Sequence, residues 1–197
     1  MSTMLDMVGA AILFGVLLLT VGRIQANINS TMYQNTYNMN VQSSAVFLAR
    51  QLEFEVLKAG YGVTGAKMKI ADSTCIAFLG ALSFSGAADS VAYYTGAADS
   101  TSLNPHDFRF IRQARSGGTI SQRLGMTDFR FSFYDTANVR MATPVTGATA
   151  LAAIRAIGIK FRLESFEPVI DPVTGTANYY AVNWEKIIYP RNLGKPF

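Results

Sequence analysis

The residues of this chain that could carry chemistry are few, and most of them stand alone. His106 is the only histidine and Cys75 the only cysteine among 197 residues. A transition-metal site needs several histidine, cysteine or carboxylate ligands at short spacings, and His106 has no such neighbours. Cys75 has no partner for a disulfide within the chain, and its apolar neighbours favour a buried structural thiol. We therefore expect neither a metal site at His106 nor a reactive thiol at Cys75.

Two polar loops contain oxygen ligands of the kind that calcium prefers. Residues 135–138 and 171–176 each combine one aspartate with amide or hydroxyl side chains. Neither loop supplies enough carboxylates for a calcium site, and both sequences are typical of turns. The sequence also lacks a serine nucleophile elbow, a Walker loop and a dinucleotide fingerprint. We therefore expect no cofactor and no catalysis.

The remaining candidate is Asp6, because it directly precedes an uncharged apolar run over residues 7–22. As an α-helix this run would be roughly 24 Å long, slightly less than the ~30 Å hydrocarbon core of a membrane. A carboxylate in a lipid-like environment is costly unless it is paired. The sequence therefore predicts a specific partner for Asp6, with a position in the lipid headgroup zone as the alternative.

The apolar run over residues 7–22 allows three interpretations. A secretory signal peptide has a positively charged start and a small-residue cleavage site. Here the stretch before the apolar run carries Asp6 rather than lysine or arginine, and no convincing cleavage site follows. A plain membrane anchor is possible, although the run is short. We favour a helix that leaves the membrane and packs against copies of itself, with a filament core formed by Val8, Ile12, Leu13, Phe14, Val16, Leu17, Leu18, Leu19 and Val21.

The elements that must position these residues begin with one long helix. Neither proline nor glycine occurs between Ile24 and Gly60, so nothing in this stretch ends a helix that starts in the apolar run. The following segment is rich in asparagine, a weak helix former, and is expected to be helical only among neighbouring helices; a flexible polar stalk is the alternative. Farther on, apolar residues at helical spacing predict packing against a sheet, through Val41, Ala45, Leu48, Leu52, Val56 and Ala59.

The rest of the chain has the period-two alternation of β-strands. Apolar residues occupy alternate positions over residues 129–133 and 157–163, and residues 108–111 and 178–189 are also expected to form strands. An alanine-rich stretch over residues 148–156 predicts a short helix. The expected fold class is α+β, with a long N-terminal α-helix packed on a C-terminal antiparallel β-sheet domain. The expected domains are 1–60, divided into an apolar segment (1–24) and a polar to amphipathic segment (25–60), and 61–197.

The charge of the chain excludes one class of partner. The formal net charge is +4, and only 15% of the residues are charged. The basic residues do not gather into a patch, so we expect no nucleic-acid binding.

Two regions of the sequence resemble type IV pilins and the pseudopilins of type II secretion. In that family the mature chain starts with a methylated amine, and an acidic residue stands at the fifth position of an apolar helix. Asp6 falls on the fifth position if Ser2 is the first mature residue, and on the sixth if Met1 is. The usual residue is glutamate, so Asp6 keeps the carboxylate but not the length. Three later segments look like the larger minor pseudopilin of the J type, namely residues 91–94, 126–135 and 152–159.

The resemblance implies a pilin-like fold and a role in assembly. Asp6 would pair with the α-amine of a neighbouring subunit, carried on methylated Ser2 or Met1. The expected function is a structural subunit of an extracellular, type IV pilus-like filament of identical chains. A membrane-bound pool would precede assembly by machinery in the inner membrane. A minor tip pseudopilin of a type II secretion system is the alternative, and a membrane-anchored extracytoplasmic binding module is a third hypothesis.

Overall fold

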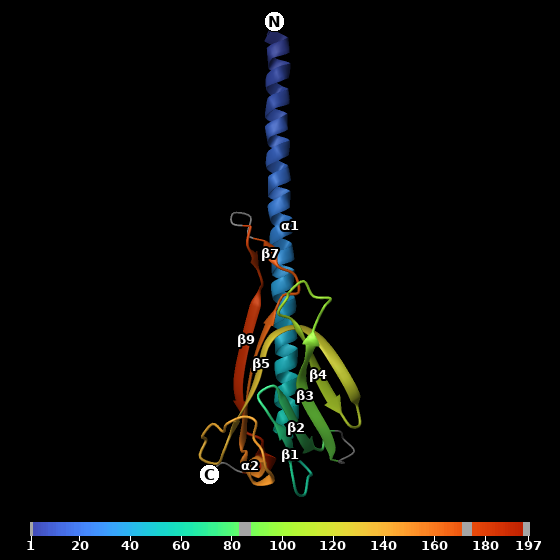
Figure 1. Ribbon diagram of the computed structural model, residues 1–197. Helices are drawn as coiled ribbons and strands as arrows, with labels where there is room; N and C mark the ends of the chain where they lie inside the picture. The colour runs from blue at the N-terminus through green and yellow to red at the C-terminus, as the bar shows by residue number, and fades with distance from the viewer. Residues whose placement is uncertain (1, 83–87, 171–174, 195–197) are drawn as a thin grey trace. The chain divides into compact units, whose positions relative to one another are not determined.

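The computed structural model describes residues 2–82, 88–170 and 175–194, with the backbone alone for Ser2. The chain forms two compact units, Met1–Met39 and Asn40–Phe197. Figure 1 shows the elements, which are α1 (Ser2–Leu57), β1 (Met68–Ala71), β2 (Cys75–Gly80), β3 (Asp89–Ala98), β4 (Phe108–Ala114), β5 (Gly118–Tyr134), α2 (Ala148–Ala153), β6 (Ala156–Glu164), β7 (Val169–Ile170), β8 (Ala177–Asn178), β9 (Ala181–Ile188) and the 3-10 helix η1 (Arg191–Leu193).

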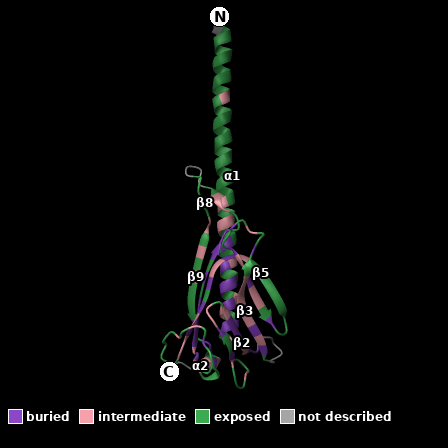
Figure 2. Cartoon of the chain, in the orientation of Figure 1, coloured by how far each residue is buried: buried purple, intermediate pink, exposed green. Residues whose placement is uncertain are grey.

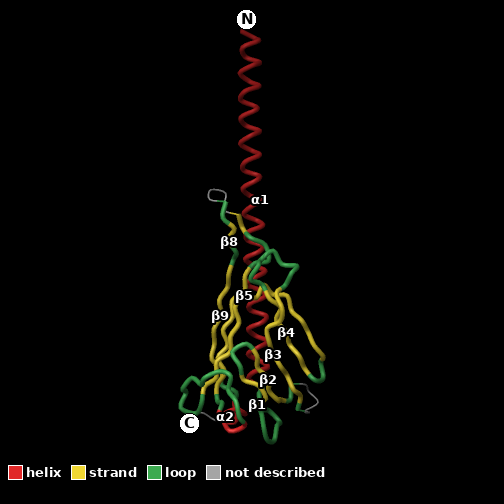
Figure 3. Tube along the Cα trace, in the orientation of Figure 1, coloured by secondary structure: helices red, strands yellow, loops and turns green. Residues whose placement is uncertain are grey.

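The first element is the long helix that the sequence predicts. α1 is helical throughout the asparagine-rich segment, so the alternative of a flexible polar stalk is not what the structure shows (Figure 3). The helix ends at Leu57, and Gly60 and Gly62 follow it with positive φ angles of 79° and 68°. Glycines at this place stop a helix because they adopt left-handed backbone without steric cost.

Most of the described strands form one antiparallel sheet. Within the described residues its order is β1-β2-β3-β4-β5-β6-β9, and β7 pairs with β8 separately. The apolar positions predicted in β5 and β6 lie opposite one another, with Phe129 beside Phe161 and Phe131 beside Ile159. All four side chains are buried, because alternate residues of a strand point to the same face.

β5 changes its partner along its length, and this change curls the sheet. Its first half pairs with β4 and its second half with β6. Gly125 lies near the change with a φ of 71°, and a Cβ there would be 2.0 Å from the carbonyl oxygen of Glu164. Only glycine fits at such a close approach. Beyond it, the Phe131 amide donates to the Ser73 carbonyl of the β1–β2 turn at 2.7 Å, so the sheet curls back toward β1.

The core of the Asn40–Phe197 unit lies between the sheet and the portion of α1 that belongs to the same unit (Figure 2). Leu48, Leu52 and Val56 are fully buried on the helix. Facing strands contribute aromatic rings, and the Tyr93 and Phe110 ring centroids are 5.6 Å apart. The predicted α+β class, with a helix packed on an antiparallel sheet, is therefore confirmed.

Some predicted boundaries differ from the structure. The strand expected over residues 178–189 is split into β8 and β9, because Tyr180 instead exchanges hydrogen bonds with Ser165. The helix expected over residues 148–156 is α2, which ends at Ala153 because Ala156 already begins β6. In β9, Trp184 stacks on Phe161 with ring centroids 5.0 Å apart.

Candidate functional site

The apolar residues of the Met1–Met39 unit are exposed all around α1. Each residue predicted for a filament core is more than half exposed, from 51% for Val21 to 73% for Leu13. A helix that is apolar on every side is stable only where something apolar surrounds it, such as lipid or other helices. This unit therefore presents a large surface that requires a partner or a membrane.

By length and composition, the α1 segment from Thr3 onward includes a stretch that could cross a membrane. None of that stretch is buried, so it is not the core helix of a soluble unit. A signal sequence near an N-terminus meets the same criteria of length and composition.

Asp6 lies in the exposed portion of α1. Among the described residues, no side chain or backbone group forms an ion pair or hydrogen bond with its carboxylate. The backbone of Ser2 is helical, and Met1 lies outside the described residues. The pairing of Asp6 with the α-amine of a neighbouring chain stays a prediction.

Three glycines interrupt the apolar surface of α1. A Cβ added at Gly9, Gly15 or Gly22 would meet nothing within 4 Å. No intramolecular contact therefore requires glycine at these positions. Glycines at these positions would allow another helix to approach α1 closely. Alternatively, they would allow α1 to unwind locally in an assembled state.

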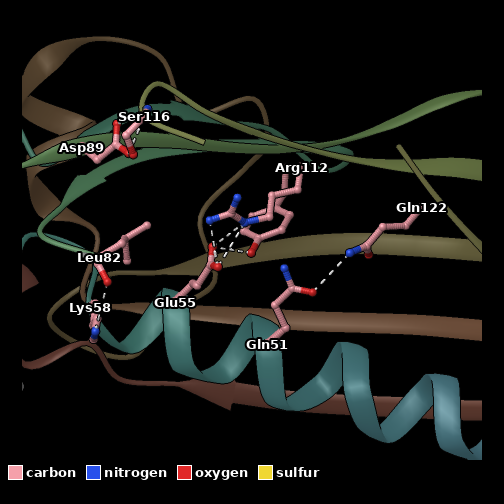
Figure 4. A network of polar contacts seen from close by, with 9 residues as sticks. Gln51, Glu55, Lys58, Leu82, Asp89, Arg112, Ser116 and Gln122 are labelled. Atoms are coloured by element: carbon pink, nitrogen blue, oxygen red, sulfur yellow. Dashed lines mark hydrogen bonds and ion pairs between the residues drawn. The ribbon is translucent and has the colours of Figure 1, made fainter. Parts of the chain in front are cut away.

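A buried polar cluster joins α1 to the sheet in the Asn40–Phe197 unit (Figure 4). The Arg112 Nε atom lies 3.0 Å from both carboxylate oxygens of Glu55, and the Tyr93 hydroxyl donates to Glu55 Oε2 at 2.5 Å. The Arg112 and Glu55 side chains are only 14% and 11% exposed. A shift of the helix on the sheet would separate the two charges and leave both buried without a partner, which is costly. The pair therefore favours one position of the helix on the sheet.

The environment of the cluster shifts the pKa values of Tyr93 and Arg112. Burial, and then the Glu55 carboxylate, raise the pKa of the Tyr93 hydroxyl. Burial opposes the charged form of Arg112, but the hydrogen bonds and the negative charge of Glu55, with contributions from Tyr93, together outweigh that effect and raise the pKa of Arg112. Tyr93 therefore stays a neutral donor and Arg112 a cation at physiological pH.

Further polar contacts support this cluster along the same helix. Gln122 Nε2 donates to Gln51 Oε1 at 3.3 Å (Figure 4). At the edge of the sheet, Lys186 of β9 pairs with Glu53 of α1 at 2.9 Å. These contacts were not predicted from the sequence, because the pairing of a helix charge with a strand charge depends on sheet order. The available signal was Glu55 itself, a carboxylate next to the apolar stripe.

A second apolar surface of α1, which we did not predict, lies within the Asn40–Phe197 unit. Phe47, Phe54 and Leu57 are 59%, 58% and 47% exposed. The two phenylalanines are seven residues apart, about two helical turns, and therefore share a face. Lys58 Nζ lies 4.1 Å from the Phe54 ring centroid, a cation–π contact. α1 thus offers apolar side chains to other molecules even where its opposite face packs on the sheet.

The loop between β3 and β4 holds two aspartates in different environments. Asp99 accepts a hydrogen bond from the Thr101 hydroxyl at 2.7 Å and from Arg123 Nε at 2.7 Å. The Thr101 hydroxyl, and then Arg123, lower the pKa of Asp99 to about 2. Asp107 is 2% exposed, and burial raises the pKa of its carboxyl.

The Asp107 environment predicts a pH-dependent gain from Asp107→Asn. The pKa of Asp107 is higher in the folded chain than in the unfolded chain, whose value is about 3.8. The carboxyl therefore does not lower the stability of the fold below pH 3.8. The free energy of unfolding falls as the pH rises from 3.8 through the folded-state pKa. At pH 7, well above 3.8, the fold therefore disfavours the ionised carboxylate of Asp107, and asparagine removes this cost. We expect Asp107→Asn to raise the free energy of unfolding by roughly 0.5–2 kcal/mol at pH 7 and by less at pH 4.5.

Urea unfolding of the full-length chain in a mild nonionic detergent checks this at the two pH values. Asp128→Asn is the control, because Asp128 pairs with Arg130 at 3.3 Å on an exposed site and should change stability by less than about 0.5 kcal/mol. A loss of stability in Asp107→Asn at pH 7 would contradict the expectation.

The isolated candidates for chemistry stay isolated. His106 is exposed in a turn. Cys75 is half-buried rather than buried as expected, because it stands at the start of β2, and burial raises the pKa of its thiol.

The two polar loops considered for calcium differ in what the structure describes. Asp135 Oδ1 accepts hydrogen bonds from the backbone of its own turn, at Ala137 and Val139. Residues 171–174 of the other loop lie outside the described residues, and the described ones contain no group of three potential metal ligands among histidine, cysteine, aspartate and glutamate.

Comparison with known proteins finds a similar solved structure. The chain is similar to a type IV-like pilin from Thermus thermophilus, with 13% sequence identity and a TM-score of 0.49 over 79% of this chain and 96% of that chain. No protein-family model matches the chain, and no curated protein matches it.

Proposed function

We propose that this chain is a structural subunit of an extracellular helical filament of the type IV pilus kind. The observation that carries the proposal is the apolar segment of α1, whose side chains are more than half exposed around the whole helix. Together with Asp6 at the start of that segment, this is the pattern for which the sequence resembles pilins. The subunits would be identical, and no catalytic role is proposed.

The physical driving force of assembly would be burial of the α1 surface. Apolar area that moves from water to a helix interface contributes about 25 cal/mol per Å². The same area gains little on leaving lipid, so transfer from a membrane pool requires assembly machinery in the inner membrane. Phe47, Phe54 and Leu57 add a second surface that neighbouring chains would cover. The filament would then lie outside the cell, with the Asn40–Phe197 units carrying its exposed sheets.

A minor tip pseudopilin of a type II secretion system is the second candidate. It is supported by the resemblance of residues 126–135 and 152–159 to the J-type pseudopilin, and these residues form the second half of β5 and the junction from α2 into β6. Both functions need the same helix and the same processing. They differ in stoichiometry, because a main subunit dominates a purified fibre and a tip subunit is rare.

Mass spectrometry of protein sheared from intact cells tests the proposal. We expect an N-terminal peptide that retains residues 2–24 and carries a methylated amine on Ser2 or Met1. The abundance of the chain relative to other fibre proteins then separates a main subunit from a tip subunit. A chain that begins near Ala26 or later would show that the apolar segment is a discarded signal and would overturn the filament proposal. A full-length chain that never polymerises would instead favour a membrane-anchored binding module.

A further inference from the structure

A cavity of about 430 Å³ opens in the Asn40–Phe197 unit between β1, α2 and η1. Figure 1 shows α2 close to β1, and the two elements are in contact. The volume lies within the range of small-molecule sites. The apolar portion of the described lining is aliphatic and contains no aromatic ring, and its residues are Ala66, Met68, Ala148, Leu151, Ala152, Ile154 and Leu193.

Two cations line the same cavity, and none of its described lining residues is acidic. Lys67 Nζ donates to the carbonyl of Asn192, and Arg155 Nη1 donates to the carbonyls of Ala152 at 2.7 Å and Ile154 at 2.9 Å. Among the described residues, neither cation forms an ion pair with a carboxylate. Both side chains are half-buried, so their charge is screened less than at an open surface.

The backbone holds both cations in place. A Cβ added at Gly60 would be 2.8 Å from Lys67 Cδ, and one added at Gly194 would be 2.7 Å from Arg155 Nε. The two side chains therefore pack directly on glycine backbone. Side chains that are already ordered lose less conformational entropy when a ligand binds.

We propose that this cavity binds a small aliphatic carboxylate. The carboxylate would accept hydrogen bonds from Lys67 and Arg155, which form no ion pair within residues 2–82, 88–170 and 175–194, and the alkyl chain would lie against Met68 and Leu151. An anion is favoured over a cation because both charges at the site are positive. An aliphatic ligand is favoured because every apolar side chain in the lining is aliphatic. This inference stands independently of the filament proposal.

Binding of octanoate to the full-length chain in nonionic detergent tests the inference. Carboxyl ¹³C-labelled octanoate is titrated and followed by NMR, with empty micelles as the blank. We expect saturable binding of one octanoate per chain, and at least about tenfold weaker binding of 1-octanol and octylammonium. Lys67→Gln should weaken octanoate binding by about tenfold, which is ~1.4 kcal/mol. Glutamine keeps an N–H donor for the Asn192 carbonyl and removes only the charge.

The matched control is Lys69→Gln, because Lys69 is exposed on β1, two residues after Lys67, and does not line this cavity. It should leave octanoate binding unchanged. Leu151→Glu provides a second variant, since the half-buried Leu151 side chain would bring a negative charge to the cavity and abolish binding. Fluorescence of the single tryptophan, Trp184, reports folding of each variant. Equal binding of octanoate and octanol, equal effects of Lys67→Gln and Lys69→Gln, or no saturable binding would overturn the inference.

Discussion

Replacing Glu55 by alanine should lower the free energy of unfolding of the Asn40–Phe197 unit by about 3–5 kcal/mol. The change leaves the Arg112 guanidinium 14% exposed without its carboxylate and removes the acceptor of the Tyr93 hydroxyl. A buried cation without a partner costs far more than the loss of a surface contact. Since a domain of this size is stabilised by only about 5–15 kcal/mol, the variant should unfold at much lower urea concentration. Trp184 fluorescence of the full-length chain in detergent measures the change.

Two further variants separate this charge effect from a general loss of packing. Glu53→Ala removes an ion pair in which the Glu53 side chain is 30% exposed and the Lys186 side chain 50% exposed. It should lower the free energy of unfolding by at most about 1 kcal/mol. The double variant Glu55→Met and Arg112→Met should recover most of the lost stability, because apolar side chains of similar volume often replace a buried pair without cost. A Glu55→Ala effect no larger than that of Glu53→Ala would contradict the expectation.

Under the proposed function, Asp6→Asn should reduce filament yield by at least tenfold, or about 1.4 kcal/mol of assembly free energy per subunit. Among the described residues Asp6 has no ionic partner, and the proposed partner is the α-amine of a neighbouring chain. Asparagine keeps the size of the side chain but removes the charge. Coulomb attraction in a water-poor core, offset by desolvation, is large enough to decide the register between subunits. The yield is measured by shearing and quantifying surface filaments.

The controls distinguish assembly from folding. Asp6→Glu keeps the carboxylate and should assemble better than Asp6→Asn. Glu185→Gln removes a carboxylate that is 70% exposed on β9 and should leave the yield unchanged. The Asn40–Phe197 unit should melt at the wild-type temperature in both Asp6 variants, because Asp6 lies outside it. Wild-type filament yield from Asp6→Asn would contradict the proposed role of the carboxylate.

Local patterns in the sequence were sufficient for the main elements. The absence of proline and glycine predicts the extent of α1, and the apolar stripe with Leu48 and Leu52 predicts which face of the helix is buried. Alternation at Phe129 and Ile157 predicts two strands that pair in the structure. These predictions succeed because each depends on the spacing of residues within one element.

Some candidate sites could be predicted from the sequence, and others depend on the fold. Asp6 and the apolar run are visible in the sequence, since a charge beside an uncharged stretch needs no knowledge of the fold. The cluster around Glu55 and the cavity with Lys67 and Arg155 were not predicted. Glu55 is 38 residues from Tyr93 and 57 residues from Arg112 along the chain. Contacts over such separations depend on strand order, curling of the sheet and the position of α2.

The sequence by itself determined that this chain has a long helix with an apolar half and a β-rich remainder. These are consequences of composition and periodicity, which act over a few residues. Only the tertiary structure decided which charges are buried together, which apolar face of α1 stays open around Phe47 and Phe54, and where two cations meet an aliphatic cavity. The physical reason is that burial and electrostatic pairing depend on distances in space, and chain folding sets those distances between residues that are remote in sequence.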